Sequence, residues 1–158
     1  MSHKLSAALG TIPAGGTLDL AIQKLSAGLP RDAGLRLADL LRRVVVGRPP
    51  SAALCAESGS VRPSVYAACE GAFVRSCELD LVYVDAHGAT SQRRIQPHGL
   101  LIQAPLWYLL AWDPSRQGGR MFRLDRIQTA RALESRAFEP LDPRALFAEI
   151  GRFGLELC

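Results

Sequence analysis

The sequence of 158 residues predicts an α+β fold in which helices come first, about five short strands follow, and one helix comes last. Apolar residues recur at helical spacing as far as residue 76, and from residue 79 the period changes to two. Asp142 and Pro143 then match the cap and the first turn of a final helix. The number and spacing of the strands favour a small barrel or a strongly bent sheet.

Two helices and a short strand are predicted in the N-terminal part. Residues 18–29 place four leucine or isoleucine side chains on one helical face, and Pro30 ends this pattern. Residues 32–43 continue with a second helical pattern, and Val44–Val46 would begin a short strand. The stretch 47–62 contains two prolines and two glycines, a composition that is typical of a linker.

A helix and a hairpin are predicted next. Pro63 suits the first turn of a helix over residues 64–76, whose buried side would carry small and apolar residues. Apolar and other side chains alternate over 79–84, which indicates a strand. The turn-forming residues 85–88 lead into a second strand over 90–96, and the two strands would close a hairpin.

The remaining strands are short and are separated by tight turns. Residues 99–103 and 106–112 are predicted as two strands around a turn at Ala104 and Pro105. Residues 120–124 and 127–133 are predicted to complete the set. The regular spacing of these turns is the reason for expecting a compact all-antiparallel unit here.

Positive charge is concentrated in residues 93–126. This segment contains six arginines and two aspartates, which gives +4, the formal net charge of the whole chain. Arginine offers a planar fork that grips phosphate with two hydrogen bonds. Tyr83, Trp107 and Tyr108 add aromatic faces on which a base could stack. The charge therefore predicts an anionic partner, while a solvated surface without a ligand stays an open alternative.

No catalytic or metal site is predicted. The four cysteines include no C-x-x-C pair, and the three histidines have no ligand spacing. The sequence has no Gly-rich phosphate loop, and the isolated carboxylates of Asp80, Asp85 and Asp125 have plainer roles in a strand, a turn and an arginine pair. We therefore expect no enzyme activity, no cofactor and no metal.

No membrane segment is predicted either. The longest purely apolar run, Leu106–Trp112, is far shorter than a membrane span. The N-terminus lacks the pattern of a secretion signal. We therefore expect a cytoplasmic protein without a membrane partner.

Three blocks of the sequence resemble the signatures of the WYL domain, in the same order and at similar spacing. They are RRIQPHGL at 93–100, WYLLAW at 107–112 and RMFRLDRI at 120–127. The strand that contains Tyr83 also fits the family pattern. The resemblance covers about residues 62–140, and three ordered blocks are much more specific than one triplet.

The resemblance implies a small five-stranded Sm-like β-barrel that senses a ligand within a bacterial transcription regulator. It implies a helical linker and dimerisation segment at 1–61, the barrel at 62–140, and a C-terminal helix and tail at 141–158. Family ligands are nucleic-acid fragments or nucleotides, and a homodimer is expected. No helix-turn-helix is recognised before residue 17, so DNA contact is expected only through a helix-turn-helix that is not present in this chain.

The same resemblance implies a set of ligand contacts. Phosphate would be neutralised by Arg94, Arg123 and Arg126, whereas a tyrosine and a histidine would stack or donate hydrogen bonds. Trp107 is expected to be mainly structural. The complete set is Tyr83, Arg94, His98, Tyr108, Arg120, Arg123 and Arg126. The alternative is a protein-interaction or dimerisation module that binds no small ligand.

Overall fold

The computed structural model describes residues 28–147 and divides the chain into two compact units, 1–41 and 42–158. The described part of the first unit is mainly α3, Arg31–Arg42. Asp32 lies in its first turn and Arg42 in its last, and both charges suit the helix dipole. The helix predicted over 32–43 is confirmed, whereas most of the helix predicted over 18–29 lies outside the described residues.

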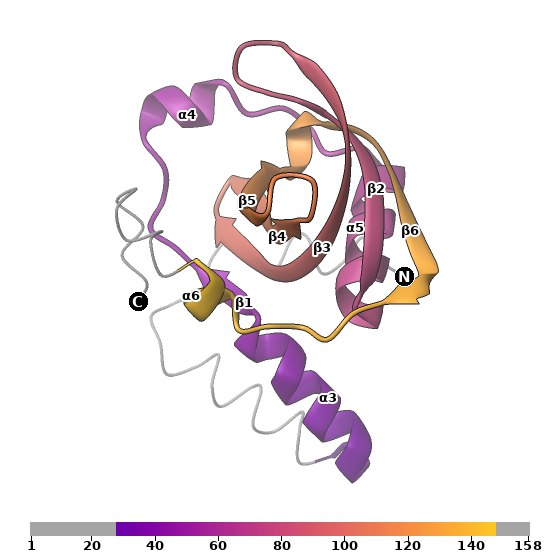
Figure 1. Cartoon of the computed structure of the whole chain (residues 1–158). Coiled ribbons are helices and arrows are strands. Elements are labelled where there is room, and N and C mark those ends of the chain that lie inside the picture. The colour runs from indigo at the N-terminus through magenta and orange to yellow at the C-terminus, as the bar shows by residue number, and fades with distance from the viewer. Residues whose placement is uncertain (1–27, 148–158) are drawn as a thin grey trace. The chain divides into compact units, whose positions relative to one another are not determined.

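The second unit is built on one six-stranded sheet (Figure 1). Its main path has the order β5-β4-β3-β2-β6, and every pairing along this path is antiparallel. The remaining strand, β1, pairs with β3 in parallel. The strands are β1 Val44–Val46, β2 Cys77–Val84, β3 Thr90–Gln103, β4 Leu106–Asp113, β5 Gly118–Arg123 and β6 Ile127–Ala137.

Strand β3 is one continuous element of 14 residues, where two separate strands were predicted. Its first half pairs with β2, from Thr90 to Ile95, and its second half pairs with β4. The register with β4 shifts between Pro97 and Gly99. Such an irregularity bends a strand without ending it, and proline is tolerated there because one ladder hydrogen bond is already missing.

The described sheet is not closed into a barrel, so the predicted Sm-like barrel is not confirmed. Strands β5 and β6 form the two ends of the main path, and no pairing joins them within residues 28–147. The 3-10 turn η1, Leu124–Arg126, follows β5 directly and leads the chain to the free edge of β2. The α+β class is as predicted, and the short strand predicted at Val44–Val46 is confirmed as β1.

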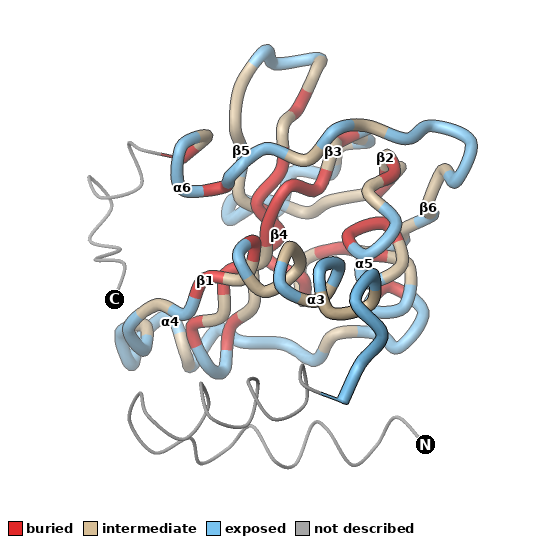
Figure 2. Tube along the Cα trace, turned by 90° about the horizontal axis from the view of Figure 1, so that it is seen from below, coloured by how far each residue is buried: buried red, intermediate tan, exposed pale blue. Residues whose placement is uncertain are grey.

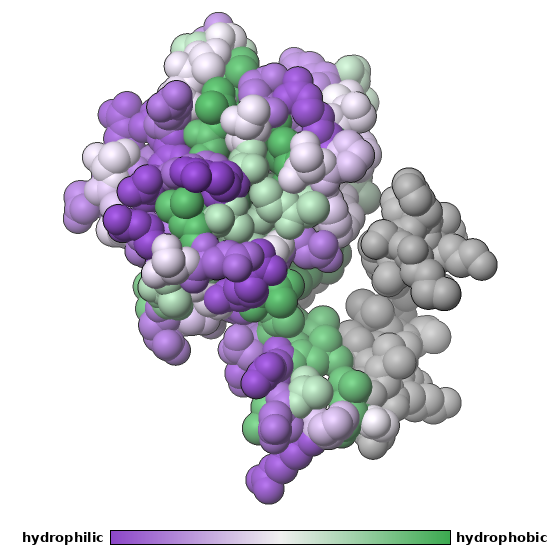
Figure 3. Space-filling view, turned by 90° about the vertical axis from the view of Figure 1, so that its right-hand side faces the viewer, coloured by the Kyte–Doolittle hydropathy of each residue, from purple (hydrophilic) through white to green (hydrophobic). Residues whose placement is uncertain are grey.

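Helix α5, Pro63–Arg75, covers β6 and β2. Pro63 stands at its start as predicted, and Ser76 ends it in the left-handed conformation. Its buried side consists of Val65, Cys69, Ala72 and Phe73. Figure 3 looks onto the side of Figure 1 where α5 and β6 lie, and there less polar side chains are surrounded by hydrophilic ones.

The predicted linker 47–62 contains a short helix, α4, Ala52–Ala56. The Ser51 hydroxyl caps it by accepting a hydrogen bond of 3.4 Å from the Leu54 N–H. Five residues are too few for a periodic apolar pattern, which explains why the sequence did not predict this helix.

The core has two parts, and Figure 2 shows buried stretches along β3, β4 and α5. The larger part includes Leu79, Leu81 and Ile95 together with Phe122 and Leu124, the last two as predicted. Trp107 is half-buried against this larger part, and its ring meets that of Tyr66 edge-on. Trp107 is therefore a packing residue, as the sequence indicated. The smaller part consists of Val45, Leu101, Leu110 and Phe147.

The segment after β6 folds back onto the bend of β3. Asp142 caps α6, Pro143–Leu146, by accepting a hydrogen bond of 2.8 Å from the Arg144 N–H. The cap is as predicted. Gly99 lies directly beneath Pro143, where an added Cβ would be 2.7 Å from the proline Cβ and 3.0 Å from the Arg43 carbonyl oxygen. The bend of β3 therefore requires a residue without a side chain at this point.

We predict that Gly99→Ala lowers the free energy of unfolding by about 1–3 kcal/mol, because the new methyl group overpacks this contact. Gly118→Ala is the matched control. Its Cβ would be 3.3 Å from the end of the flexible Arg120 side chain and 3.7 Å, an ordinary contact, from the Arg116 carbonyl oxygen, so we expect a smaller loss. Urea denaturation of both variants measures the difference, and equal losses would contradict the packing argument.

Candidate anion-binding site

The structure places the seven predicted contact residues in different surroundings. Arg94 lies in a hollow on the sheet, which we call the outer hollow. A cluster that we call the arginine corner lies where β5 passes through η1 into β6. His98 is buried at the bend of β3, and Arg120 is exposed on β5. The arginine corner consists of Tyr83, Tyr108, Arg123, Asp125 and Arg126.

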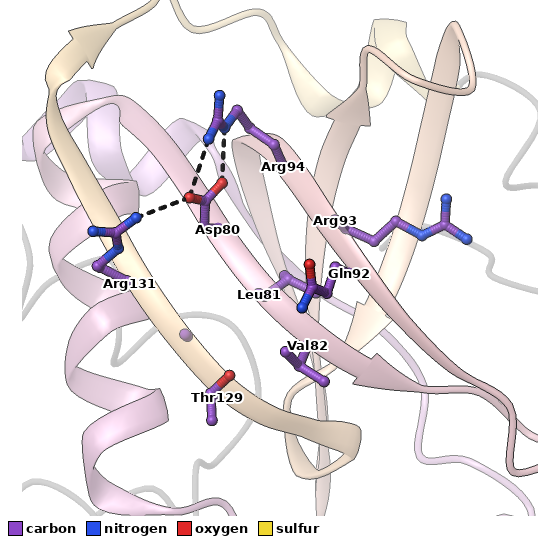
Figure 4. A pocket seen from close by; sticks show the side chains of 9 residues that line it. Asp80, Leu81, Val82, Gln92, Arg93, Arg94, Thr129 and Arg131 are labelled. Carbon is purple, nitrogen blue, oxygen red and sulfur yellow. Dashed lines mark hydrogen bonds and ion pairs between the residues drawn. The ribbon is translucent and has the colours of Figure 1, made fainter.

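The outer hollow lies on the face that β3, β2 and β6 turn away from the core (Figure 4). The strand register explains its composition, because residues directly opposite each other share a face. Asp80 is paired with Arg94 on one side and with Arg131 on the other. Two residues along, Val82 is paired with Gln92 and Thr129. The hollow has a volume of about 460 Å³ and is lined by Asp80, Leu81, Val82, Gln92, Arg93, Arg94, Thr129, Ala130 and Arg131.

Asp80 holds two guanidinium groups at the outer hollow. Arg94 donates to its two carboxylate oxygens at 2.7 and 3.2 Å, and Arg131 donates to one of them at 3.3 Å. The hydrogen bond from Arg94, followed by those of Arg131 and the positive charges, lowers the pKa of Asp80 despite its partial burial. Two cations therefore share one carboxylate, and their outward edges are open to solvent. This leaves one excess positive charge at the hollow.

Arg93 and Arg94 point to opposite sides of β3. Figure 4 shows the Arg93 side chain directed away from the Asp80 group. Its Nη1 lies 3.8 Å from an oxygen of Asp113, and its Nε donates to the Ser91 hydroxyl at 3.3 Å. Only one of the two adjacent arginines therefore brings its charge to the outer hollow.

Arg123 and Asp125 form a buried pair in the arginine corner. The guanidinium donates to the carboxylate at 3.1 and 2.7 Å, and the two side chains are only 5% and 7% exposed. The hydrogen bond with Asp125 raises the pKa of Arg123. Burial raises the pKa of Asp125, but the hydrogen bonds from Arg123 and Gly59 and the nearby positive charges together lower it. Both groups are therefore charged at neutral pH, and the pair is part of the core.

The two tyrosines of the arginine corner are half-buried. The Tyr83 hydroxyl accepts a hydrogen bond of 3.3 Å from the Arg123 N–H, and its ring meets Phe122 edge-on. Tyr108 packs against the smaller part of the core, and burial is the main cause of its raised pKa. Their rings are therefore largely engaged in packing.

Arg126 is more accessible than Arg123. Its Nη2 lies 3.5 Å from a carboxylate oxygen of Glu57, a side chain that is 64% exposed. An ion pair of this kind contributes about 0–1 kcal/mol. The Glu57 carbonyl oxygen also accepts a hydrogen bond of 3.2 Å from Nη2 of Arg123. Glu57 therefore touches both arginines of the corner but is held there weakly by its side chain.

His98 is 2% exposed and is engaged by the segment after β6. Its Nδ1 accepts a hydrogen bond of 3.0 Å from the Leu141 N–H, and its ring meets Phe138 edge-on at 4.8 Å. Burial, with the nearby charge of Arg43, lowers the pKa of His98 to about 4. The imidazole is therefore neutral at physiological pH, and its hydrogen bond and ring contact hold the C-terminal segment against the bend of β3.

Arg120 is exposed in the first half of β5, and its Nη1 donates to the Gly119 carbonyl oxygen at 2.9 Å. No ion pair joins Arg120 to an acidic residue within the described part of the chain. Its charge is therefore available at the surface, although within the described residues it makes no hydrogen bond or ion pair with another of the predicted contact residues.

Asp80 and Arg131 were not recognised as site residues from the sequence. A signal for Asp80 was present, since a hairpin with its turn at 85–88 brings position 80 opposite position 94. No comparable signal exists for Arg131, which reaches the site only because β6 pairs with β2. Long-range strand pairing of this kind cannot be read from local periodicity.

The described residues contain no group of three or more His, Cys, Asp or Glu side chains arranged to hold a metal ion. Between residues 28 and 147 we also find no helix with the length and apolar character needed to cross a membrane.

Comparison with known proteins identifies one domain within the chain. A sequence model of the WYL domain matches residues 64–132. Residues 64–132 are a WYL domain. Among solved structures, proteasome accessory factor B/C (PafBC) of Arthrobacter aurescens is similar, with a TM-score of 0.52 and 22% sequence identity. The match covers 70% of this chain but only 16% of that protein, so the likeness shows the fold alone.

We predict that Asp125→Asn destabilises the WYL domain by about 3–5 kcal/mol, because it leaves a buried guanidinium without its counter-charge. The pKa of Asp125 is lower in the folded protein than its ordinary value of 3.8. Its contribution is therefore present above that value and is lost as the pH falls below it. Urea denaturation at neutral pH and near pH 3 measures both effects. Asp85→Asn is the control, because it neutralises an exposed carboxylate that accepts two backbone hydrogen bonds, and it should cost clearly less than Asp125→Asn.

His98 predicts a second loss of stability on acidification, at higher pH than the loss expected for Asp125. The unfolded chain binds a proton at the ordinary histidine pKa of 6.5, whereas the folded protein resists protonation down to about 4. Stability should therefore fall as the pH is lowered through this interval, by up to about 3 kcal/mol. His98→Gln removes the titration, so its stability should change less between pH 6.5 and 4. A variant that loses stability as steeply as the natural protein would contradict this account.

Proposed function

We propose that this chain is the effector-binding module of a bacterial transcriptional regulator and that it senses a nucleotide or a single-stranded nucleic acid. The module is cytoplasmic, catalyses no reaction and uses no cofactor. What supports the proposal is the WYL domain at 64–132 together with the chemistry of the outer hollow. The observation that carries it is the pair of solvent-open guanidinium groups held by one carboxylate, since such a pair attracts phosphate.

The outer hollow offers the groups that a nucleotide needs. Arg94 and Arg131 are kept in place by Asp80 and still have donors directed to solvent, which suits two phosphate oxygens. The flat guanidinium faces also suit stacking on a base. The Gln92 amide and the Thr129 hydroxyl lie along the same face and can hydrogen-bond to base or sugar edges. Arg94 is therefore the first of the proposed contacts.

The other proposed contacts have a secondary part. Tyr83, Tyr108 and Arg123 are engaged in the arginine corner, and His98 is engaged by the C-terminal segment. Arg126 and Arg120 remain more accessible. We propose that these side chains can meet phosphates of a nucleic-acid ligand that extend beyond the outer hollow.

The proposal also includes the organisation of the regulator. We propose a helical linker and dimerisation segment over 1–61, the ligand-binding domain over 62–140 and a C-terminal helix and tail over 141–158. The working form is a homodimer. DNA would be bound through a helix-turn-helix that is not recognised in this sequence. The ligand would act by shifting the relative arrangement of the subunits or of that DNA-binding domain.

We predict that Arg94→Gln and Arg131→Gln each weaken binding of short single-stranded DNA by about tenfold, because each removes a charged hydrogen-bond donor. Fluorescence titration at two salt concentrations measures the effect, with cyclic dinucleotides as a second ligand. Affinity for single-stranded DNA should fall as salt rises, and each lost contact should reduce the slope of log K against log salt by about 0.7.

Arg75→Gln is the matched control, because Arg75 is an exposed arginine that pairs with Glu134 away from the hollow. It should bind as the natural protein does. Binding that neither hollow variant changes would contradict the site. Light scattering on the same samples tests the alternative, since a chain that self-associates but binds no anion would be a protein-interaction module.

A further inference from the structure

A segment of six residues, 57–62, runs beside residues 123–128, and we call it the strap. Three contacts tie the two segments with the same offset of 66 residues. The Glu57 carbonyl accepts from Arg123, and the Gly59 N–H donates to Asp125 at 2.9 Å. Arg62 donates to the backbone and side-chain oxygens of Gln128 at 2.6 and 2.8 Å. The strap therefore lies beside the chain from Arg123 to Gln128, which includes three residues of the arginine corner.

The strap presents oxygen atoms to the two arginines of the corner. The Glu57 carbonyl oxygen accepts from Nη2 of Arg123, and the Glu57 carboxylate pairs with Arg126. These are the positions at which phosphate oxygens would be bound by the same donors. In addition, Nη1 of Arg123 is buried without a hydrogen-bond partner among the described residues. The corner thus has one donor in excess of the acceptors that surround it.

The two acidic residues at the arginine corner, Asp125 and Glu57, differ in how firmly they are held. The pair between Arg123 and Asp125 is buried, with a shortest distance of 2.7 Å, and such a pair is not opened without a large cost. Glu57 is mostly exposed, and its carboxylate stands 3.5 Å from Arg126. A competing anion would therefore replace Glu57 and leave Asp125 in position.

We propose that Glu57 acts as an internal anion that closes the arginine corner, and that a phosphate group exchanges with it and releases the strap. The corner is then a second anion-binding site, separate from the outer hollow and available only when Glu57 leaves. The incoming phosphate meets Arg126 and the Nη2 of Arg123, while Asp125 keeps Arg123 in place. The exchange deepens the proposed function, because it gives an anionic ligand a means of changing the conformation of the chain between α4 and α5.

Hydrogen–deuterium exchange of the strap tests this inference, because the Gly59 N–H is held by Asp125. In Glu57→Gln the charge is lost with little change of size, and exchange over 57–62 should be several-fold faster than in the natural protein. Arg126→Gln should have the same effect. Glu134→Gln is the matched control, since Glu134 is an exposed carboxylate that pairs with Arg75 at 3.1 Å. It should leave the strap unchanged.

Inorganic pyrophosphate tests the exchange itself. It should speed up strap exchange in the natural protein, and sodium chloride of equal ionic strength should have a smaller effect. In Glu57→Gln the pyrophosphate effect should saturate at a several-fold lower concentration. Equal strap exchange in Glu57→Gln and the natural protein would overturn the role of Glu57, and a strap that pyrophosphate does not affect would overturn the anion exchange.

The test is independent of the outer hollow. Arg94→Gln should lose affinity for single-stranded DNA and still show the natural response of the strap to pyrophosphate. If no variant binds nucleic acid but the strap responds, the proposed ligand class is wrong and the strap inference stands. If nucleic acid binds and the strap does not respond, the proposed ligand class stands and the strap inference is wrong.

Discussion

The bend of β3 between Pro97 and Gly99 is the constraint on which the rest of the WYL domain depends. It allows one strand to pair with β2 in its first half and with β4 and β1 in its second half. The first half therefore forms the outer hollow with β2 and β6, while the second half supports the smaller part of the core. His98 and Gly99 lie at the bend itself and receive the segment after β6. The candidate site and the attachment of the C-terminal segment thus share one structural origin.

The arginines that give the chain its positive charge are not equivalent. Arg123 is neutralised by Asp125 inside the core, and Arg94 is paired with Asp80 at the surface. Because desolvation makes a buried ion costly without its partner, the first pair is structural. The second keeps donors in contact with solvent and can accept an anion. Net charge alone therefore overstates the number of arginines that are available to a ligand, and burial decides which of them remain.

Much of the fold could be predicted from the sequence, because α5, β2 and β4 have clear apolar periods and Pro63 marks a helix start. The continuity of β3 could not, since Pro97 and Gly99 are residues that locally favour a turn, and only pairing with two neighbours keeps the strand extended. The site was predicted less completely. Arg94 was predicted from its sequence block, whereas Arg131 joins it through the pairing of positions 80 and 131, which are 51 residues apart.

The order of strength among the ion pairs determines how an anion can act on this domain. At the outer hollow, the proposed anion would add to Arg94 and Arg131 without breaking their pairs with Asp80, so binding there would require no rearrangement of the fold. At the arginine corner, Nη2 of Arg123 and the guanidinium of Arg126 already meet Asp125 and Glu57. Binding there must displace the weaker of the two, which is the exposed Glu57. On the proposed function, a ligand would therefore be held at the hollow without a structural change and would move the chain only where it replaces an internal anion.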